Sequence, residues 1–256
     1  MGKPANGSGR CPTSVWRDLL RETCALIDSL SVTPAWAFGG GTSLSVHLGH
    51  RHSYDIDAFV GASSVIRELT PNRNAATKAL LKGRPYEYPG HYLKLHLEGG
   101  EIDFLVWTIL SETPTVEWEF EGRVLAIDTP WETAGKKLFY RPSTLKVRDI
   151  FDLAAVIEAF PNEFLAVLPE VEEKMPLAID RVDAFLPAYE ADAIKEINPT
   201  ERGKHLMRRD AAETVLGFLR SWRAPDWRGA RVPILWWRQP PNVRVGEPQP
   251  QRVREP

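Results

Sequence analysis

The spacing of apolar residues changes along the chain near residue 128. Before this point, segments such as Tyr92 to Leu97 and Glu101 to Trp107 place apolar residues at every second position, the period of a β-strand. After Pro130 the apolar residues recur at helical spacing, over 131–140, 148–160, 162–174, 177–195 and 200–222. We therefore predict an α/β (α+β) fold with two domains. The first, 13–128, contains a mixed sheet, and the second, 129–225, is helical.

The first domain also contains helical patterns and shorter strands. Helices are predicted over 14–30, 43–48, 62–70 and 72–82, and further strands over 35–38, 53–60, 116–120 and 123–127. Thr42 is a candidate N-cap for the helix 43–48. Residues 1–12 are rich in Gly, Pro, Ser and Lys, so we expect a disordered tail there. Residues 226–256 form an Arg- and Pro-rich C-terminal tail, of which we expect 239–256 to be disordered.

Composition excludes several classes of protein. The 32 Lys and Arg residues against 34 Asp and Glu residues give a net charge of −2, which excludes a uniformly basic nucleic-acid-binding protein. The two cysteines, Cys11 and Cys24, suit neither a disulfide framework nor a zinc site. The sequence shows no signal peptide and no apolar stretch of membrane-spanning length, so we expect a cytoplasmic protein that does not bind a membrane.

A glycine-rich turn follows the predicted strand 35–38. Gly39, Gly40 and Gly41 precede the helix 43–48, and a helix that starts after glycines presents free backbone N–H groups to an anion. The hydroxyl groups of Thr42 and Ser43 offer further hydrogen-bond donors. A glycine turn at a helix start therefore favours the binding of a phosphate.

Two carboxylates, Asp55 and Asp57, lie two residues apart on the next predicted strand, so their side chains leave the same face. Such a pair repels unless a cation lies between them, and Mg²⁺ (or Mn²⁺) prefers carboxylate and phosphate oxygens. Asp103, on a later strand, offers a third carboxylate, and three carboxylates can hold two metal ions for phosphoryl transfer. A pair of aspartates alone more often marks a solvated sheet face; its combination with the glycine turn and Asp103 favours a metal site.

The order Gly-Gly, Thr/Ser and then Asp-x-Asp resembles the signature of the DNA polymerase β-like nucleotidyltransferase superfamily. The longer phrase from Gly39 to Phe59 is similar to the AbiEii/AbiGii-type nucleotidyltransferase toxins. In the second half, the segment from Lys136 to Leu153 resembles that family's Lys…Arg…Arg-Asp-x-x-Asp-Leu pattern, with its acids at Asp149 and Asp152. The resemblance covers residues 34–160.

The resemblance implies a role for each matched residue. Gly40, Gly41, Thr42 and Ser43 would cradle the nucleotide phosphates. Asp55, Asp57 and Asp103 would bind Mg²⁺, with Asp103 as a possible base for the acceptor hydroxyl. Lys137 would contact the triphosphate, although Lys136 could be the matching lysine, and Asp149 would be an active-site acid. Arg148 would contribute to nucleotide binding.

The implied function is Mg²⁺-dependent transfer of a nucleoside monophosphate from an NTP to an acceptor. The family resemblance favours tRNA as the acceptor, and a toxin of a toxin–antitoxin or phage-defence system with a cognate antitoxin. Two alternatives remain open: the acceptor is a protein or small-molecule hydroxyl, or the chain is a non-catalytic nucleotide-binding module.

Local charge favours an RNA partner despite the near-neutral total. Basic residues gather in 136–148 and in 202–209. Ordinary solvated helix surface is the competing interpretation of these runs. Arg51, between His50 and His52, is a further candidate for orienting a phosphate or the acceptor.

Overall fold

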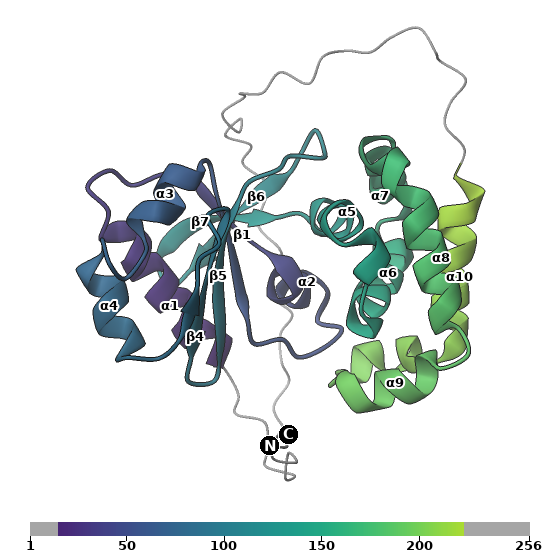
Figure 1. The fold of residues 1–256 in the computed structure, drawn as a ribbon. Coiled ribbons are helices and arrows are strands. Elements are labelled where there is room, and N and C mark those ends of the chain that lie inside the picture. The colour runs from purple at the N-terminus through teal and green to yellow at the C-terminus, as the bar shows by residue number, and fades with distance from the viewer. Residues whose placement is uncertain (1–14, 223–256) are drawn as a thin grey trace, which may run out of the picture. The chain divides into compact units, whose positions relative to one another are not determined.

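The computed structural model describes residues 15–222, and it has the mixed α/β fold that the sequence predicts (Figure 1). The described residues form two compact units, each built from two chain segments. The first unit takes residues up to 36 and 53–107, and the second takes 37–52 and the residues from 108 onward. The predicted domain boundary near residue 128 stays a prediction, and the two predicted tails lie outside the described residues.

The first unit contains a mixed sheet. Its strands are β2 (Ile56–Val60), β3 (Tyr86–Glu87), β4 (Tyr92–Leu97) and β5 (Gly100–Val106), in the order β3-β4-β5-β2. β5 pairs parallel with β2 and antiparallel with β4. Three helices, α1 (Val15–Asp28), α3 (Ser63–Glu68) and α4 (Ala75–Leu81), pack against these strands.

The strand period decides which side chains of this sheet form the core. In β5, Ile102 and Phe104 are fully buried, whereas the alternate residues Glu101 and Asp103 are only partly buried. Successive side chains of a strand point to opposite faces, so the apolar residues occupy one face and the acidic residues the other.

The second unit contains β1 (Trp36–Gly39, from Ala37 onward), β6 (Thr115–Phe120) and β7 (Arg123–Asp128), in the order β1-β7-β6. β1 pairs parallel with β7, and β6 pairs antiparallel with β7. Helix α2 (Gly40–Leu48) begins directly after β1 and contacts β7.

Six further helices complete the second unit: α5 (Pro130–Tyr140), α6 (Val147–Ala159), α7 (Pro161–Val167), α8 (Met175–Phe185), α9 (Tyr189–Glu196) and α10 (Arg209–Ser221). Three 3₁₀ segments lie between them: η1 (Pro142–Thr144), η2 (Leu168–Lys174) and η3 (Glu201–Met207). Helix α6 contacts α5, α7, α9 and α10, and its side chains Ile150, Phe151 and Leu153 are fully buried. The core of this unit is therefore built around α6.

Several predicted elements differ in their boundaries. The segment 177–195 is two helices, because Pro187 lacks the N–H group that a continuous helix needs. In 162–174, α7 gives way to η2 next to Pro169, and 200–222 is η3 followed by α10. The capping prediction for Thr42 is wrong: α2 begins at Gly40 with Gly39 as N-cap, so Thr42 lies inside the helix. Of the helices in residues 15–222, none combines the length and apolar character needed to cross a bilayer.

Candidate active site

The acidic residues of the first unit meet on the polar face of two paired strands. Asp57 on β2 is the register partner of Asp103 on β5. Asp55 lies just before β2, and its Oδ1 accepts the backbone N–H of Glu101 at 3.1 Å. The structure therefore brings the three predicted metal ligands to neighbouring positions, although β2 is shorter than the predicted strand 53–60 and excludes Asp55.

Asp103 has an unusual electrostatic environment. Burial, followed by the charge of Asp57, raises the pKa of Asp103 to about 7. The ammonium of Lys94, 2.7 Å from Asp103 Oδ2, opposes that rise. Asp103 Oδ1 is buried and has no hydrogen-bond partner among the described residues. Oδ2 of this carboxylate thus has a cationic partner, whereas no described residue donates a hydrogen bond to Oδ1.

These residues fit a divalent cation. Mg²⁺ commonly binds one or two carboxylates together with substrate phosphates and water. The adjacent Asp57 and Asp103, with the unpartnered Oδ1, supply such a carboxylate pair. In the part of the chain that the structure describes, no group of three or more His, Cys, Asp or Glu side chains is arranged to hold a metal ion by itself.

The predicted phosphate-binding turn lies in the second unit, at the start of α2. Gly40 has a φ of +72°, a left-handed conformation that favours glycine, and it places the chain on the path into the helix. The first turn of a helix leaves backbone N–H groups available to an anion. Thr42 and Ser43 are buried, and the Ser43 hydroxyl donates to the Gly40 carbonyl at 2.8 Å. The backbone, more than these hydroxyl groups, is therefore available for a phosphate.

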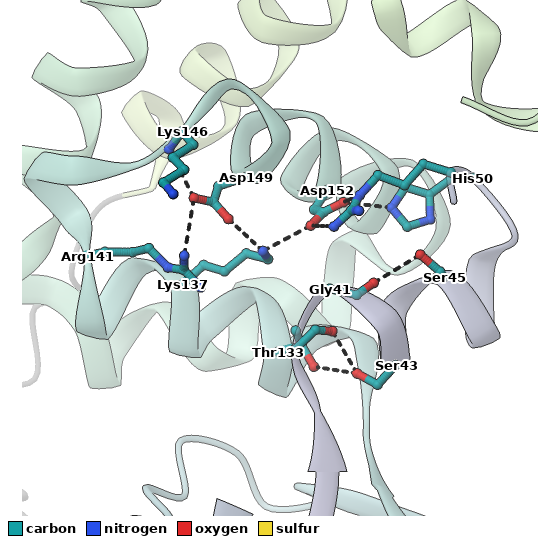
Figure 2. Close-up of polar contacts among 12 residues, drawn as sticks. Gly41, Ser43, Ser45, His50, Thr133, Lys137, Arg141, Lys146, Asp149 and Asp152 are labelled. Carbon is teal, nitrogen blue, oxygen red and sulfur yellow. Dashed lines mark hydrogen bonds and ion pairs between the residues drawn. The ribbon is translucent and has the colours of Figure 1, made fainter. Parts of the chain in front are cut away.

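Helix α2 packs against α5 in this unit, and Figure 2 shows Ser43 beside Thr133. The two hydroxyl oxygens are 3.4 Å apart. Lys137 lies one helical turn after Thr133, so both residues belong to the same side of α5. The glycine turn and the predicted triphosphate lysine are thus positioned by the same pair of packed helices.

Lys137 lies between two aspartates of α6 (Figure 2). Its buried ammonium is 2.7 Å from Asp149 Oδ1 and 2.9 Å from Asp152 Oδ2. This confirms the expectation that the spacing of Asp149 and Asp152 places both on one helix face. Burial opposes ionisation of Asp149, but the charges of Lys137 and Arg141 and the hydrogen bonds from Lys137 and the Lys146 backbone together outweigh it and lower the Asp149 pKa.

Lys136 is also buried, but it has different partners. Its ammonium is 2.7 Å from Asp128 Oδ2, at the end of β7, and 3.6 Å from Glu132 Oε1. Lys137, by contrast, contacts both aspartates of the Arg-Asp-x-x-Asp segment of α6. The burial of both lysines also shows that 136–148 is not a continuous basic surface, because two of its cations point into ion pairs inside the protein.

Asp152 connects Lys137 to the loop that follows α2. The guanidinium of Arg51 donates from Nε at 2.6 Å and from Nη2 at 2.9 Å to the two oxygens of Asp152. His50 Nε2 lies 2.8 Å from Asp152 Oδ1. Burial raises the Asp152 pKa, yet the charges of Arg51 and Lys137 together with the hydrogen bonds from Arg51 and His50 hold it well below its ordinary value. Arg51 is buried in this ion pair, so it anchors the loop to α6.

The family model for the "Nucleotidyl transferase AbiEii toxin, Type IV TA system" matches residues 26–228. The chain belongs to the AbiEii nucleotidyltransferase toxin family. This AbiEii protein is therefore a nucleotidyltransferase and the toxin of a type IV toxin–antitoxin system, a type of system in which a cognate antitoxin is the partner.

Several solved structures are similar to this AbiEii toxin. A candidate nucleotidyltransferase from H. pylori is 13% identical, with a TM-score of 0.46, and the match covers 81% of this chain and 94% of that chain. JHP933 from Helicobacter pylori is 15% identical, with a TM-score of 0.45 and coverage of 79% and 89%.

The antibiotic-resistance factor ANT(2'')-Ia is 14% identical, with a TM-score of 0.37 and coverage of 80% and 91%. Because these TM-scores are low, the family model alone carries the assignment of the AbiEii toxin. No curated protein matches the chain.

The predicted site residues of the AbiEii toxin fall into two groups. Asp55, Asp57 and Asp103 belong to the first unit; the second unit holds the glycine turn, Lys137, Asp149 and the partly buried Arg148. Sequence reasoning missed the ion pair between Arg51 and Asp152, whose residues are 101 positions apart. Both Arg51 and Asp152 lie in motifs that the sequence shows, but their spacing gives no indication that they form a pair.

Proposed function

We propose that this toxin transfers a nucleoside monophosphate from an NTP to tRNA, and that the reaction depends on Mg²⁺. The observation that carries the metal dependence is the Asp57–Asp103 pair with its buried, unpartnered oxygen. The family resemblance supports tRNA as the acceptor.

In the proposed reaction, the acceptor hydroxyl oxygen forms a bond to the α-phosphorus of the NTP. The bond from that phosphorus to the bridging oxygen of the β-phosphate breaks, and pyrophosphate leaves. Bound at Asp57 and Asp103, with Asp55 beside them, Mg²⁺ would neutralise charge on the triphosphate. Asp103 is also the proposed acceptor of the proton from the acceptor hydroxyl, a role that the family resemblance implies.

The second unit supplies the proposed triphosphate contacts. The backbone N–H groups of Gly40 and Gly41 suit phosphate oxygens, and so does the compact ammonium of Lys137. We favour Lys137 over Lys136 because it contacts Asp149, the acid that the family pattern matches. Asp149 and Asp152 hold the ammonium in place, and Arg148 in the first turn of α6 adds a further cation.

Exposed basic residues of the second unit support an RNA acceptor. Arg202, Lys204, Arg208 and Arg209 are all exposed within eight residues of the chain, on η3 and at the start of α10. Lys204 and Arg209 pair with exposed acids, Glu201 and Glu213. Exposed ion pairs contribute little free energy, so these side chains can exchange their carboxylate for a backbone phosphate.

The proposal is tested with each labelled NTP and, separately, tRNA or a protein extract. Wild-type enzyme is expected to label tRNA in the presence of Mg²⁺, and sequencing of RNA 3′ ends identifies the added nucleotide. EDTA is expected to abolish the labelling, and added Mg²⁺ to restore it. Labelled protein without labelled RNA would overturn the tRNA proposal, and full activity in EDTA would overturn the metal dependence.

Asp57→Asn is the matched catalytic variant, and Asp180→Asn, at an exposed position of α8, is its control. Asp57→Asn is expected to lower the transfer rate by at least about 10²-fold, the effect of removing one transition-state contact. It is also expected to relieve toxicity in a bacterial host, whereas Asp180→Asn stays fully active and toxic. Equal activity of the two variants would contradict the role of Asp57.

A further inference from the structure

Lys94 lies directly beside the proposed metal site. It is the register partner of Asp103 across the antiparallel pair β4–β5, while Asp57 is the partner on the parallel side. The Lys94 ammonium is 2.7 Å from Asp103 Oδ2 and 2.6 Å from Glu101 Oε2. Asp103 is therefore flanked by a cation and an acid within one row across the sheet.

The two oxygens of Asp103 differ in what they contact. Oδ2 accepts a hydrogen bond from Lys94, and the buried Oδ1 has no hydrogen-bond partner among the described residues. A divalent cation at Oδ1 and the ammonium at Oδ2 would share one carboxylate. Positive charges this close repel strongly where water is partly excluded.

Lys94 has a second carboxylate that can retain it. Glu101 lies two residues before Asp103 on the same face of β5, and it contacts the Lys94 ammonium directly. The other oxygen of Glu101 is 3.0 Å from His96 Nδ1, and His96 Nε2 is 3.0 Å from Glu87. These contacts hold Glu101 in place, so Lys94 can give up Asp103 without losing its ion pair.

We propose that Lys94 is the resident counter-cation of Asp103 and competes with the divalent metal ion for that carboxylate. This inference rests on the proposed metal dependence of the reaction. Without metal, Lys94 neutralises Asp103; when metal binds, Lys94 pairs with Glu101 alone. The competition keeps the affinity of the bare enzyme for metal low, so the metal enters with the NTP, whose phosphates supply additional negative charge.

The test measures Mn²⁺ binding to the purified full chain at pH 8 without nucleotide, from the electron paramagnetic resonance signal of free Mn²⁺. Lys94→Met removes the charge, and Lys94→Gln removes it but keeps hydrogen-bond donors for both carboxylates. Lys78→Met is the matched control, because Lys78 is an exposed lysine on α4 of the same unit. Both Lys94 variants are expected to bind Mn²⁺ roughly tenfold more tightly than wild type, and Lys78→Met to bind as wild type does.

Unchanged or weaker Mn²⁺ binding by the folded Lys94 variants, with measurable binding by wild type, overturns the role of Lys94 and leaves the metal dependence standing. If none of the proteins binds Mn²⁺ without nucleotide, the Lys94 proposal is overturned, because removal of Lys94 did not expose a metal site; the EDTA experiment then decides the metal dependence separately. If Lys78→Met also binds Mn²⁺ tenfold more tightly, the effect comes from the change in net charge, and the proposal is overturned. Circular dichroism establishes folding; if Lys94→Met unfolds, Lys94→Gln decides.

Discussion

At the scale of single residues, Asp152 is the centre of a buried group of ion pairs. It is fully buried and contacts Arg51, His50 and Lys137. Breaking one member of a buried ion-pair group leaves uncompensated buried charge. This residue therefore combines a large stability contribution with control over the placement of Lys137.

Asp152→Asn is expected to destabilise the protein by about 3–5 kcal/mol at pH 7, because Arg51 loses its anion. The Asp152 pKa in the folded state lies well below its ordinary value of 3.8. Its contribution to stability is therefore complete above about pH 4 and is lost as the pH falls through the folded-state pKa. Urea unfolding of both proteins is expected to show a smaller difference at pH 3 than at pH 7. A difference that is constant between these pH values would contradict the assignment.

The two adjacent lysines of α5 form a matched pair for testing function. Lys136→Met and Lys137→Met each remove a buried ammonium from ion pairs, so we expect similar losses of stability. Only Lys137→Met is expected to lower kcat for nucleotide transfer, by about 10²-fold or more, because only Lys137 is the proposed triphosphate contact. Transfer kinetics at a temperature where both variants stay folded make the comparison. A larger loss of kcat in Lys136→Met would reverse the assignment.

At the scale of elements, the loop after α2 is held by a distant segment. The backbone N–H of His52 donates to the Asn198 carbonyl at 2.9 Å, and that of Thr200 donates to the His50 carbonyl at 3.1 Å. Thr200 Oγ1 also donates to the Gly49 carbonyl at 2.5 Å. The segment 198–203 therefore fixes the backbone that carries Arg51 toward Asp152.

Gly203 allows the closest approach between these two segments. A Cβ atom at Gly203 would lie 1.9 Å from the His50 carbonyl oxygen, a distance that forces backbone to move. Gly203→Ala is expected to destabilise the protein by roughly 2 kcal/mol or more, as overpacking does. The control is Gly217→Ala in α10, where a Cβ meets open space; helix propensity predicts about 1 kcal/mol of stabilisation there. Thermal unfolding of both variants checks the prediction, and a stable Gly203→Ala protein would refute it.

Sequence reasoning succeeded where the pattern was local. Period-two alternation predicted β4 and β5, and the i, i+3 spacing of Asp149 and Asp152 predicted their shared face. Helix boundaries at Pro187 and Pro169 were missed because the apolar spacing continues across both prolines. The pairing of Arg51 with Asp152 depends on the packing of α2 and α6, which no local pattern encodes. Burial of Lys136 and Lys137 was missed for the same reason.

At the scale of the whole molecule, acidic and basic residues are nearly equal in number but gather in different places. Acidic residues gather on the polar face of β2 and β5, and exposed basic residues gather on η3 and α10. Lys136 and Lys137, which the sequence places in the basic run 136–148, form ion pairs with the buried acids Asp128 and Asp149. A chain with a net charge of −2 can thus bind a polyanion through one small surface.

Charge reversal of Arg202 and Arg208 tests that surface. The double variant Arg202→Glu/Arg208→Glu is expected to raise KM for tRNA by about tenfold or more, because both exposed cations are proposed phosphate contacts. Its KM for the NTP is expected to stay unchanged, since neither residue belongs to the proposed nucleotide site. The salt dependence of tRNA binding should also become weaker than in wild type. Unchanged tRNA kinetics would place the RNA surface elsewhere.

The contacts between the loop 49–52 and the segment 198–203 also bear on the synthesis of this toxin. His50 and Arg51 are translated about 150 residues before Asn198 and Thr200, whose backbone groups hold this loop. A ribosome-bound chain that ends before Asn198 has α2 and its glycine turn but lacks the partners that fix the loop behind them. The growing polypeptide therefore cannot complete this part of the structure until translation has passed Thr200.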